Sequence, residues 1–222
     1  MKPYYSEGGI TIYHGDCREV LPTLDLAGAV CITDPPYGID HESNHVCETT
    51  TAPWMNSTIA NDNSTEARDQ ILSRFADWVC FASFKAPAPT GYRGLVIWDK
   101  GPASGMGDLS FPWKASFEPV YIAGSCWSGR RDEGVLKDRW IVTRASMGRV
   151  HPNEKPISLM AEFIDKTPAE ATIVDPFAGS GSTLVAAKLS GRKAIGIEIE
   201  ERYCEIAAKR LAQGVLFGGG AA

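Results

Sequence analysis

An acid, two prolines and an aromatic ring follow an apolar run in the segment VCITDPPYGID, residues 30–40. The apolar run is typical of a buried strand, and because proline cannot continue a strand ladder, we expect the strand to stop at Asp34. Each proline fixes its own φ angle and biases the preceding residue toward extended geometry. The pattern predicts a rigid hook over residues 34–37 that fixes a carboxylate relative to backbone carbonyls and the Tyr37 ring. The alternative is a plain proline turn with Tyr37 packed over it.

A second group of candidate residues lies in TIVDPFAGSGSTLVAAKLSGRKAIGIEIEERY, residues 172–203. A strand is expected to end in Asp175, a turn rich in glycine follows, and a helix begins at Ser182 or Thr183. Small residues let the backbone approach a ligand closely, and the start of a helix offers unpaired N–H groups to an anion. Glu198 ends the next expected strand, where an acid can reach a ribose diol.

Three classes of ligand could use this strand–turn–helix. A P-loop needs a lysine before the Ser/Thr, and this segment has none. A dinucleotide site needs Gly-x-Gly-x-x-Gly directly after the strand, whereas Asp-Pro-Phe intervenes here and the third glycine is missing. A cofactor with one adenosine, one carboxylate and no pyrophosphate remains, and S-adenosyl-L-methionine fits that description. The alternatives are a plain turn at Gly-Ser-Gly and a strand-end acid at Glu198.

The elements that must position these residues alternate along the chain. Strands are expected in residues 8–16, 29–33, 94–99, 117–124, 171–175 and 193–199. Helices are expected in residues 17–24, 64–81, 156–166, 182–191 and 200–212. This alternation predicts an α/β fold with a mostly parallel sheet and helices on both faces. The polar stretch 40–64 is long for a loop, which is typical of a functional lid or a partly disordered segment.

Composition sets wider bounds. The 222 residues suit one α/β domain with an elaboration, and 44% hydrophobic with 22% charged residues is ordinary for a soluble protein. No apolar run is long enough to span a membrane, and MKPYYSEGG lacks a signal-peptide core. Six scattered cysteines without a Cys-x-x-Cys pair argue against a structural zinc site or a disulfide scaffold, and for a reduced cytosolic location. We therefore expect no metal and no membrane partner.

Charge is unevenly distributed although the net charge is only −5. Residues 126–155 hold seven basic residues and four acids, whereas residues 38–70 hold six acids and one arginine. Such a basic stretch predicts a face for nucleic acid, because a positive patch can coexist with an acidic remainder. Solvated basic loops would give the same pattern.

Five segments together make the chain resemble a known family. They are YHGDC (13–17), DPPY (34–37), HPNEKP (151–156), DPFAGSGST (175–183) and GIEIEERY (196–203). In this order they resemble the amino-directed DNA methyltransferases, specifically the circularly permuted beta subgroup in which the catalytic motif precedes the cofactor motif. The resemblance covers most of the chain. It implies a Rossmann-like class I S-adenosylmethionine-dependent methyltransferase fold with a seven-stranded, mostly parallel sheet.

The resemblance assigns catalysis to the hook. Asp34 and the Pro35 carbonyl would accept the two hydrogens of an exocyclic amine, Pro36 would hold the shape, and Tyr37 would stack on a flipped-out base. An ordinary aspartate, with a pKa of roughly 4, need not remove the amine proton before attack. It can instead stabilise the positive charge that develops on nitrogen.

The resemblance also implies a cofactor site. Its residues would be Asp16, Cys17, Lys155, Asp175, Phe177, Ala178, Gly179, Ser180, Gly181, Ser182, Thr183 and Glu198. Asp16 would accept from the adenine amine, Glu198 from the ribose hydroxyls, and Lys155 would meet the carboxylate together with the helix start. Asp175 would orient the loop or face the ammonium group. The alternatives are a helix cap at Asp16 and a solvated lysine at Lys155.

Target choice would fall to residues 125–150 and to the polar loop 40–63. The arginines expected to grip phosphates or read guanine are Arg130, Arg131, Arg139, Arg144 and Arg149. The segment 125–150 is short for a recognition insert, which implies a short site, a homodimer partner or weak specificity. The expected organisation is a catalytic half at 1–124, this insert at 125–150, a cofactor half at 151–217 and a flexible tail at 218–222.

The leading hypothesis is methyl transfer from S-adenosyl-L-methionine to the N6 amine of adenine in double-stranded DNA, in the cytoplasm of a bacterial or phage-infected cell. In this family an acid at the first hook position leans toward adenine. The alternatives are a DNA cytosine-N4 methyltransferase, an RNA or protein-glutamine N-methyltransferase, and a non-catalytic DNA-binding protein. A separate restriction endonuclease would be a further partner.

Overall fold

The computed structural model describes residues 1–39, 62–101, 110, 112–137 and 154–213, which belong to two compact units. The first unit comprises Met1–Thr33 and Lys155–Ala222, and the second comprises Asp34–Glu154. The chain therefore enters the second unit at the first residue of the hook and leaves it at Glu154.

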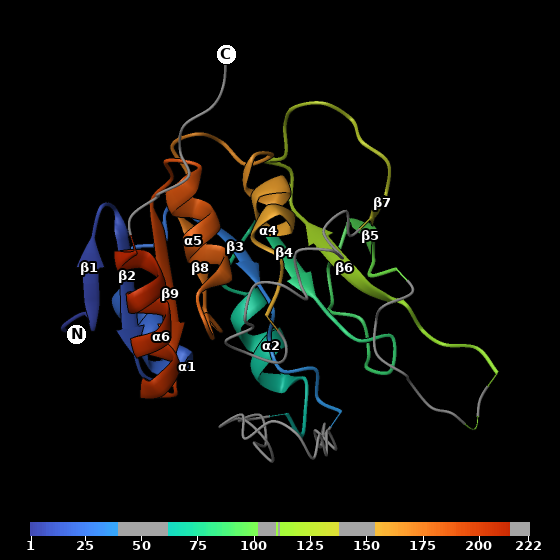
Figure 1. Cartoon of the computed structure of the whole chain (residues 1–222), viewed down its shortest axis with the longest axis horizontal. Coiled ribbons are helices and arrows are strands. Elements are labelled where there is room, and N and C mark those ends of the chain that lie inside the picture. Colours follow the sequence, from blue (N-terminus) through green and yellow to red (C-terminus); the bar gives the residue numbers. More distant parts are fainter. Residues whose placement is uncertain (40–61, 102–109, 111, 138–153, 214–222) are drawn as a thin grey trace. The chain divides into compact units, whose positions relative to one another are not determined.

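The sheet of the first unit has the strand order β1-β2-β9-β8-β3 (Figure 1). Its strands are β1 (Tyr5–Glu7), β2 (Ile10–His14), β3 (Val30–Thr33), β8 (Ile173–Asp175) and β9 (Ala194–Glu198). Strands β2, β9, β8 and β3 run parallel, and β1 pairs with β2 in the antiparallel sense. All residues of β3 and β8 are buried, which suits strands with both faces covered.

The helices of the first unit are α1 (Cys17–Val20), the 3₁₀ turn η1 (Leu21–Thr23), α4 (Ile157–Ile164), α5 (Ser182–Leu189) and α6 (Glu201–Ala212). Figure 1 shows α4, α5 and α6 side by side, with α5 between its two neighbours. In α6 the buried residues Tyr203, Cys204, Ala207 and Leu211 recur with the helical period. That apolar stripe explains why the segment forms a helix against the sheet.

The second unit contains α2 (Glu66–Leu72), β4 (Trp78–Phe81), β5 (Gly94–Asp99), β6 (Phe117–Ala123) and β7 (Val135–Lys137). Its strand order is β4-β6-β5-β7. Strand β6 is antiparallel to both β4 and β5, whereas β5 and β7 are parallel.

The helix predicted over residues 64–81 is wrong in its second half. Helix α2 ends at Leu72, and Trp78–Phe81 forms β4 instead. All four residues of β4 are buried, and the strand pairs with β6 from Trp78 opposite Ala123 to Phe81 opposite Val120. Helical spacing of the apolar residues was misleading here, because a continuous run of four bulky apolar residues also suits a strand buried on both faces.

The α/β class is confirmed, and the other predicted strands and helices are found close to their expected bounds. The resemblance implied seven strands and the sequence pattern located six, whereas the described residues form nine. Strand β4 replaces part of a predicted helix, and the three-residue strands β1 and β7 were not predicted. Within the described part of the chain, no helix is long and apolar enough to cross a membrane.

Candidate active site

The hook begins directly after β3, as the prolines predict. Strand β3 ends at Thr33, Asp34 is half-buried and Pro35 is buried. The Tyr37 hydroxyl donates to Asp34 Oδ1 at 2.8 Å, and Glu118 Oε2 lies 3.2 Å away. Burial raises the pKa of Tyr37 well above 10, and the charges of Asp34 and Glu118 add to the effect. The phenol therefore keeps its proton and remains a donor to the Asp34 carboxylate.

The turn that follows the hook is fixed by close packing. The Gly38 backbone N–H donates to Asp62 Oδ1 at 2.8 Å, and Asp62 is only 4% exposed. Gly38 has a φ angle of +70°, and a Cβ there would lie 2.7 Å from the Ser64 carbonyl carbon. Only glycine fits this position without strain. Asp62 was not predicted, because it stands among many polar residues in the sequence.

Three acids predicted for the cofactor site come together because of the sheet topology. Asp175 and Glu198 are the last residues of β8 and β9, and Asp16 lies two residues after β2. These strands are parallel neighbours, so their carboxyl ends lie at one edge of the sheet. Open α/β sheets bind ligands at that edge.

The Glu198 carboxylate is held by backbone amides. Its Oε2 accepts from Gly179 N at 2.7 Å and its Oε1 from Glu200 N at 2.8 Å. Burial raises the pKa of Glu198 above 4.5, although the two amides oppose the shift. Each carboxylate oxygen has two lone pairs, so both retain the capacity to accept from a hydroxyl. These two bonds fix the orientation of the side chain, and its contact with a ribose diol stays a prediction.

Asp175 links three segments of the first unit. Its Oδ1 accepts from the Thr33 hydroxyl at 2.7 Å and from Phe177 N at 3.2 Å, and its Oδ2 accepts from the Thr183 hydroxyl at 2.6 Å. Of the two roles left open by the sequence, these bonds support orientation of the loop. The Thr183 hydroxyl proton is used by Asp175, so Thr183 can offer a ligand carboxylate its backbone N–H.

The turn between β8 and α5 packs closely against α6 at Gly181, whereas the expected close approach to a ligand stays a prediction. Gly181 has a φ angle of +83°, and a Cβ there would lie 2.8 Å from the Ala207 Cβ. Ala178 N donates to Ile197 O at 2.9 Å, and Arg210 Nη1 donates to Ser180 O at 2.7 Å. Phe177, which precedes Ala178 in the chain, is half-buried. Arg210 was not predicted as part of the site.

A buried hydroxyl stands at the start of α5, which begins at Ser182 as predicted. Ser182 is 8% exposed, and its Oγ has no hydrogen-bond partner among the described residues. Buried polar groups are normally paired, so this hydroxyl has an unused hydrogen-bonding capacity. Together with the free amides of a helix N-terminus it fits a carboxylate ligand.

Asp16 caps a helix in the structure. Its carboxylate accepts from Arg18 N at 2.8 Å and forms an ion pair with the Arg18 side chain. The side-chain hydrogen bonds from Arg18 lower the pKa of Asp16. The cap that the sequence left as an alternative is therefore present, and the adenine contact stays a prediction. Next to it, Cys17 is buried, and burial raises the pKa of its thiol to about 12.

Lys155 is not the solvated lysine of the alternative interpretation. It is 7% exposed and stands immediately before Pro156, the N-cap residue of α4. Buried charges are normally paired in proteins, and the contact of Lys155 with a cofactor carboxylate stays a prediction.

Two of the five predicted DNA-binding arginines lie in the described part of the second unit. Arg130 and Arg131 are exposed, and Arg130 Nε lies 3.1 Å from Asp132 Oδ1. Arg139, Arg144 and Arg149 lie outside the described residues, as does most of the loop 40–63.

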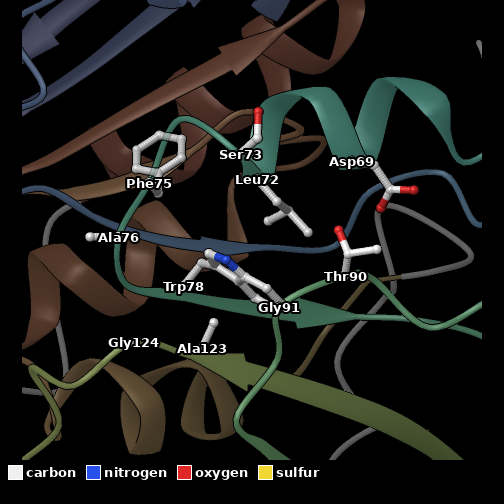
Figure 2. A pocket seen from close by; sticks show the side chains of 10 residues that line it. All are labelled: Asp69, Leu72, Ser73, Phe75, Ala76, Trp78, Thr90, Gly91, Ala123 and Gly124. Atoms are coloured by element: carbon white, nitrogen blue, oxygen red, sulfur yellow. The ribbon is translucent and has the colours of Figure 1, made fainter.

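A pocket of about 240 Å³ in the second unit contains none of the predicted site residues. Figure 2 shows its lining, which comes from the end of α2, the segment 75–78, Thr90, Gly91, Ala123 and Gly124. Its one charged side chain, Asp69, binds Arg68. The pocket is therefore separate from the hook chemistry. No cluster of metal-binding side chains occurs among the described residues.

The chain is similar in sequence and in fold to several known proteins. Residues 97–209 match the family model N6_N4_Mtase, described as DNA methylase. The chain is 48% identical to the Type II methyltransferase M2.DpnII of Streptococcus pneumoniae, over 95% of this chain and 92% of that protein. It is 46% identical to the Type II methyltransferase M2.LlaDCHI of Lactococcus lactis subsp. cremoris, over 98% and 94%. The crystal structure of the M1.HpyAVI–SAM complex shares the fold, with a TM-score of 0.59 at 21% identity, over 90% and 99%.

Proposed function

Because this chain belongs to the N6/N4 DNA methylase family, we propose that it transfers a methyl group from S-adenosyl-L-methionine to the N6 amine of adenine in double-stranded DNA. The acid at the first position of the hook favours adenine. Cytosine-N4 methylation is the second candidate, because the family model includes both kinds of enzyme.

The observation that carries the proposal is the fixed Asp34 carboxylate. It follows the last residue of a fully buried strand, and the Tyr37 hydroxyl donates to its Oδ1 at 2.8 Å. The lone pair of an exocyclic amine is delocalised into the ring, so the amine is a poor nucleophile. A carboxylate and the Pro35 carbonyl that accept its hydrogens stabilise the positive charge that develops on nitrogen. Such preorganised acceptors need no rearrangement as the reaction proceeds.

Base flipping follows from the same chemistry. The amine of a paired adenine is inaccessible to a protein hook, so the base must leave the helix. Tyr37 and Pro36 would then replace part of the lost stacking. Because its hydroxyl binds Asp34, the Tyr37 ring would meet the base already oriented.

The first unit supplies the proposed cofactor residues. Glu198 would accept from the ribose hydroxyls, and Asp16 and Cys17 would contact the adenine. Segment 177–181 would line the methionine part, while the α5 start and Lys155 would receive the carboxylate. The unpaired Ser182 hydroxyl supports this fit. When bound, S-adenosyl-L-methionine supplies an electrophilic methyl group, and the amine that accepts it loses one proton.

The proposal also covers the protein partners of this chain and the place where it acts. Relatives from bacteria are named Type II methyltransferases, which supports a separate restriction endonuclease as a functional partner. A homodimer would compensate for the short insert at 125–150. We propose that the protein acts in the cytoplasm of a bacterial or phage-infected cell, where it would meet its DNA substrate. The described cysteines are free thiols, which is compatible with a reducing compartment.

One experiment tests the proposal directly. The purified protein is incubated with S-adenosyl-L-methionine and duplex DNA that lacks methylation, and the digested nucleosides are identified by mass spectrometry. We expect N6-methyladenine. Detection of N4-methylcytosine would support the same hook chemistry but would identify cytosine as the target base instead of adenine. A protein that binds the cofactor but yields neither product would contradict DNA methylation, and RNA or protein substrates would then be tested.

A further inference from the structure

Glu118 and Lys100 form an ion pair that the sequence did not predict. Glu118 on β6 lies opposite Trp98 on β5, and the ladder continues with Lys100 N donating to Ser116 O at 2.7 Å. Lys100 Nζ binds Glu118 Oε1, and it also lies 5.0 Å from the centroid of the Trp98 ring. The two charged side chains are 25% and 14% exposed. The pair is therefore held by two strands in a site that is largely withdrawn from water.

The Trp98 ring, which lies beneath this ion pair, is firmly packed. Trp98 is 2% exposed and packs edge-on against Phe81, with ring centroids 6.2 Å apart. A cation over an indole ring is attracted by the ring face, and the attraction grows as water is removed. Lys100 is thus held by the Glu118 carboxylate and by the Trp98 ring, so its position is well defined.

The second oxygen of Glu118 points to the hook. The Tyr37 hydroxyl shares its one proton between Asp34 Oδ1 at 2.8 Å and Glu118 Oε2 at 3.2 Å. Lys100, Glu118, Tyr37 and Asp34 therefore form a continuous chain of polar contacts within the second unit. The end of this chain is the carboxylate that the proposed reaction uses.

We propose that Glu118, held by Lys100, is a positioning residue for methyl transfer: it orients the Tyr37 hydroxyl and, through it, the Asp34 carboxylate. The inference rests on the proposed function, because it gives the contact a role in that reaction. Two carboxylates around one phenol repel each other, and the nearby Lys100 cation offsets this repulsion. The two carboxylates can then accept from the same phenol, and Asp34 is held in place as an acceptor.

Two further ionisable groups among the described residues lie near the chain of contacts. Cys80 on β4 is affected by the charge of Asp34, but burial raises the pKa of its thiol far above neutrality, so it stays uncharged. Arg68 of α2 also acts on Cys80, and its guanidinium binds Asp69 and the Pro87 carbonyl. Lys100, by contrast, contacts Glu118 directly.

The test compares the pH dependence of kcat for wild type, Glu118→Gln, Lys100→Met and the double variant. Glu118→Gln leaves the Lys100 cation near Asp34, so the acid limb of the profile should move to lower pH. Lys100→Met leaves the two acids unbalanced, so the acid limb should move to higher pH. In the double variant both charges are absent, and the midpoint should return toward that of wild type. A role in folding alone would not produce shifts of opposite sign that cancel.

A second measurement separates positioning from binding. Glu118→Ala should lower kcat by roughly 10- to 100-fold, the range expected for losing one hydrogen bond to a charged group. The KM for S-adenosyl-L-methionine should stay unchanged, because the proposed cofactor residues belong to the first unit. Glu170→Gln, an exposed change in the first unit, and Lys209→Met, on the exposed side of α6, are the matched controls.

The outcomes are distinguishable. Wild-type enzyme that gives no methylated nucleoside would contradict the proposed function itself. Active wild type whose Glu118→Gln and Lys100→Met variants keep its kcat and its acid limb would overturn only the positioning role. If Glu118→Ala does not fold, the acid limbs of Glu118→Gln and Lys100→Met still test the positioning role. Shifts of the two limbs in the same direction would also refute that role.

Discussion

The Thr183 hydroxyl donates to Asp175 Oδ2 at 2.6 Å, which ties the first turn of α5 to the end of β8. The Thr33 hydroxyl donates to the other oxygen of the same carboxylate at 2.7 Å. All three side chains are buried. The shape of the proposed cofactor loop therefore depends on a carboxylate whose two oxygens are bound from different elements.

Thr183→Val should destabilise the first unit. Valine keeps the size of the side chain but removes this hydrogen bond to Asp175 Oδ2, and a hydrogen bond to a charged group contributes about 1.5–3 kcal/mol. Urea unfolding followed by circular dichroism measures the loss. Thr11→Val is the control, because the Thr11 hydroxyl contacts Ser6 at an exposed site. Equal stabilities for the two variants would show that the bond contributes nothing.

Asp34→Ala should abolish methyl transfer and leave cofactor binding intact. The change removes the acceptor that stabilises the charged amine, whereas the proposed cofactor residues lie in the other unit. Calorimetric titration with S-adenosyl-L-methionine and a methylation assay together measure both properties. Asp25→Ala, at an exposed turn, should retain both. A large loss of cofactor affinity in Asp34→Ala would show that its role is misassigned.

Glu198→Gln should weaken cofactor binding by at least about tenfold, since an amide can present only one acceptor oxygen where the carboxylate presents two. In wild type, the affinity should fall as the pH is lowered toward the raised pKa of Glu198, above the 4.5 of an ordinary glutamate. Calorimetry across pH in both proteins checks this. A pH dependence that persists in the variant would assign the titration to another group.

Ionisation of Glu198 should favour cofactor binding but lower the stability of the folded protein. Its pKa is higher in the folded protein than the unfolded value of 4.5, so folding favours the protonated form. Its stabilising contribution is complete below about pH 4.5 and is lost as the pH rises through the folded pKa. At neutral pH, Glu198 thus serves the proposed ligand at some expense to the fold.

Gly181→Ala should destabilise the protein more than Gly191→Ala. Both glycines have a positive φ angle, +83° and +66°, so both variants strain the backbone. Only at Gly181 would the added Cβ also meet a neighbour, the Ala207 Cβ at 2.8 Å. The difference between their unfolding free energies isolates the contact between the loop and α6. Equal losses of unfolding free energy in the two variants would mean that α6 shifts to accommodate the added Cβ at no energetic cost.

Arg131→Ala should weaken DNA binding and reduce the slope of log K against log salt by about one, as expected for one lost phosphate contact. Fluorescence anisotropy with a labelled duplex over a series of salt concentrations measures the slope. Arg74→Ala, another exposed arginine of the second unit, provides the comparison. A slope unchanged in Arg131→Ala would remove this residue from the proposed DNA face.

The sequence predicted features whose cause is local. Proline chemistry ends β3 at Thr33, and the glycine turn places the start of α5 at Ser182, because both depend on adjacent residues. The network around Tyr37 was missed because Glu118 is 81 residues away in the chain and meets it only through tertiary structure. The burial of Lys155 and the strand at Trp78–Phe81 were missed for the same reason. Tertiary packing overrode what charge and helical spacing suggested locally.

The division of the chain has a consequence for its synthesis. Strand β2 pairs with β9, with Ile10 opposite Ala194, so this pairing of the first unit waits for nearly the whole polypeptide to leave the ribosome. The second unit, Asp34–Glu154, is complete much earlier. Because domains generally fold as their residues emerge, the hook should acquire its surroundings while the cofactor half is still being translated. A ribosome stalled after residue 154 would hold the residues of the proposed catalytic hook without most of those that bind the methyl donor.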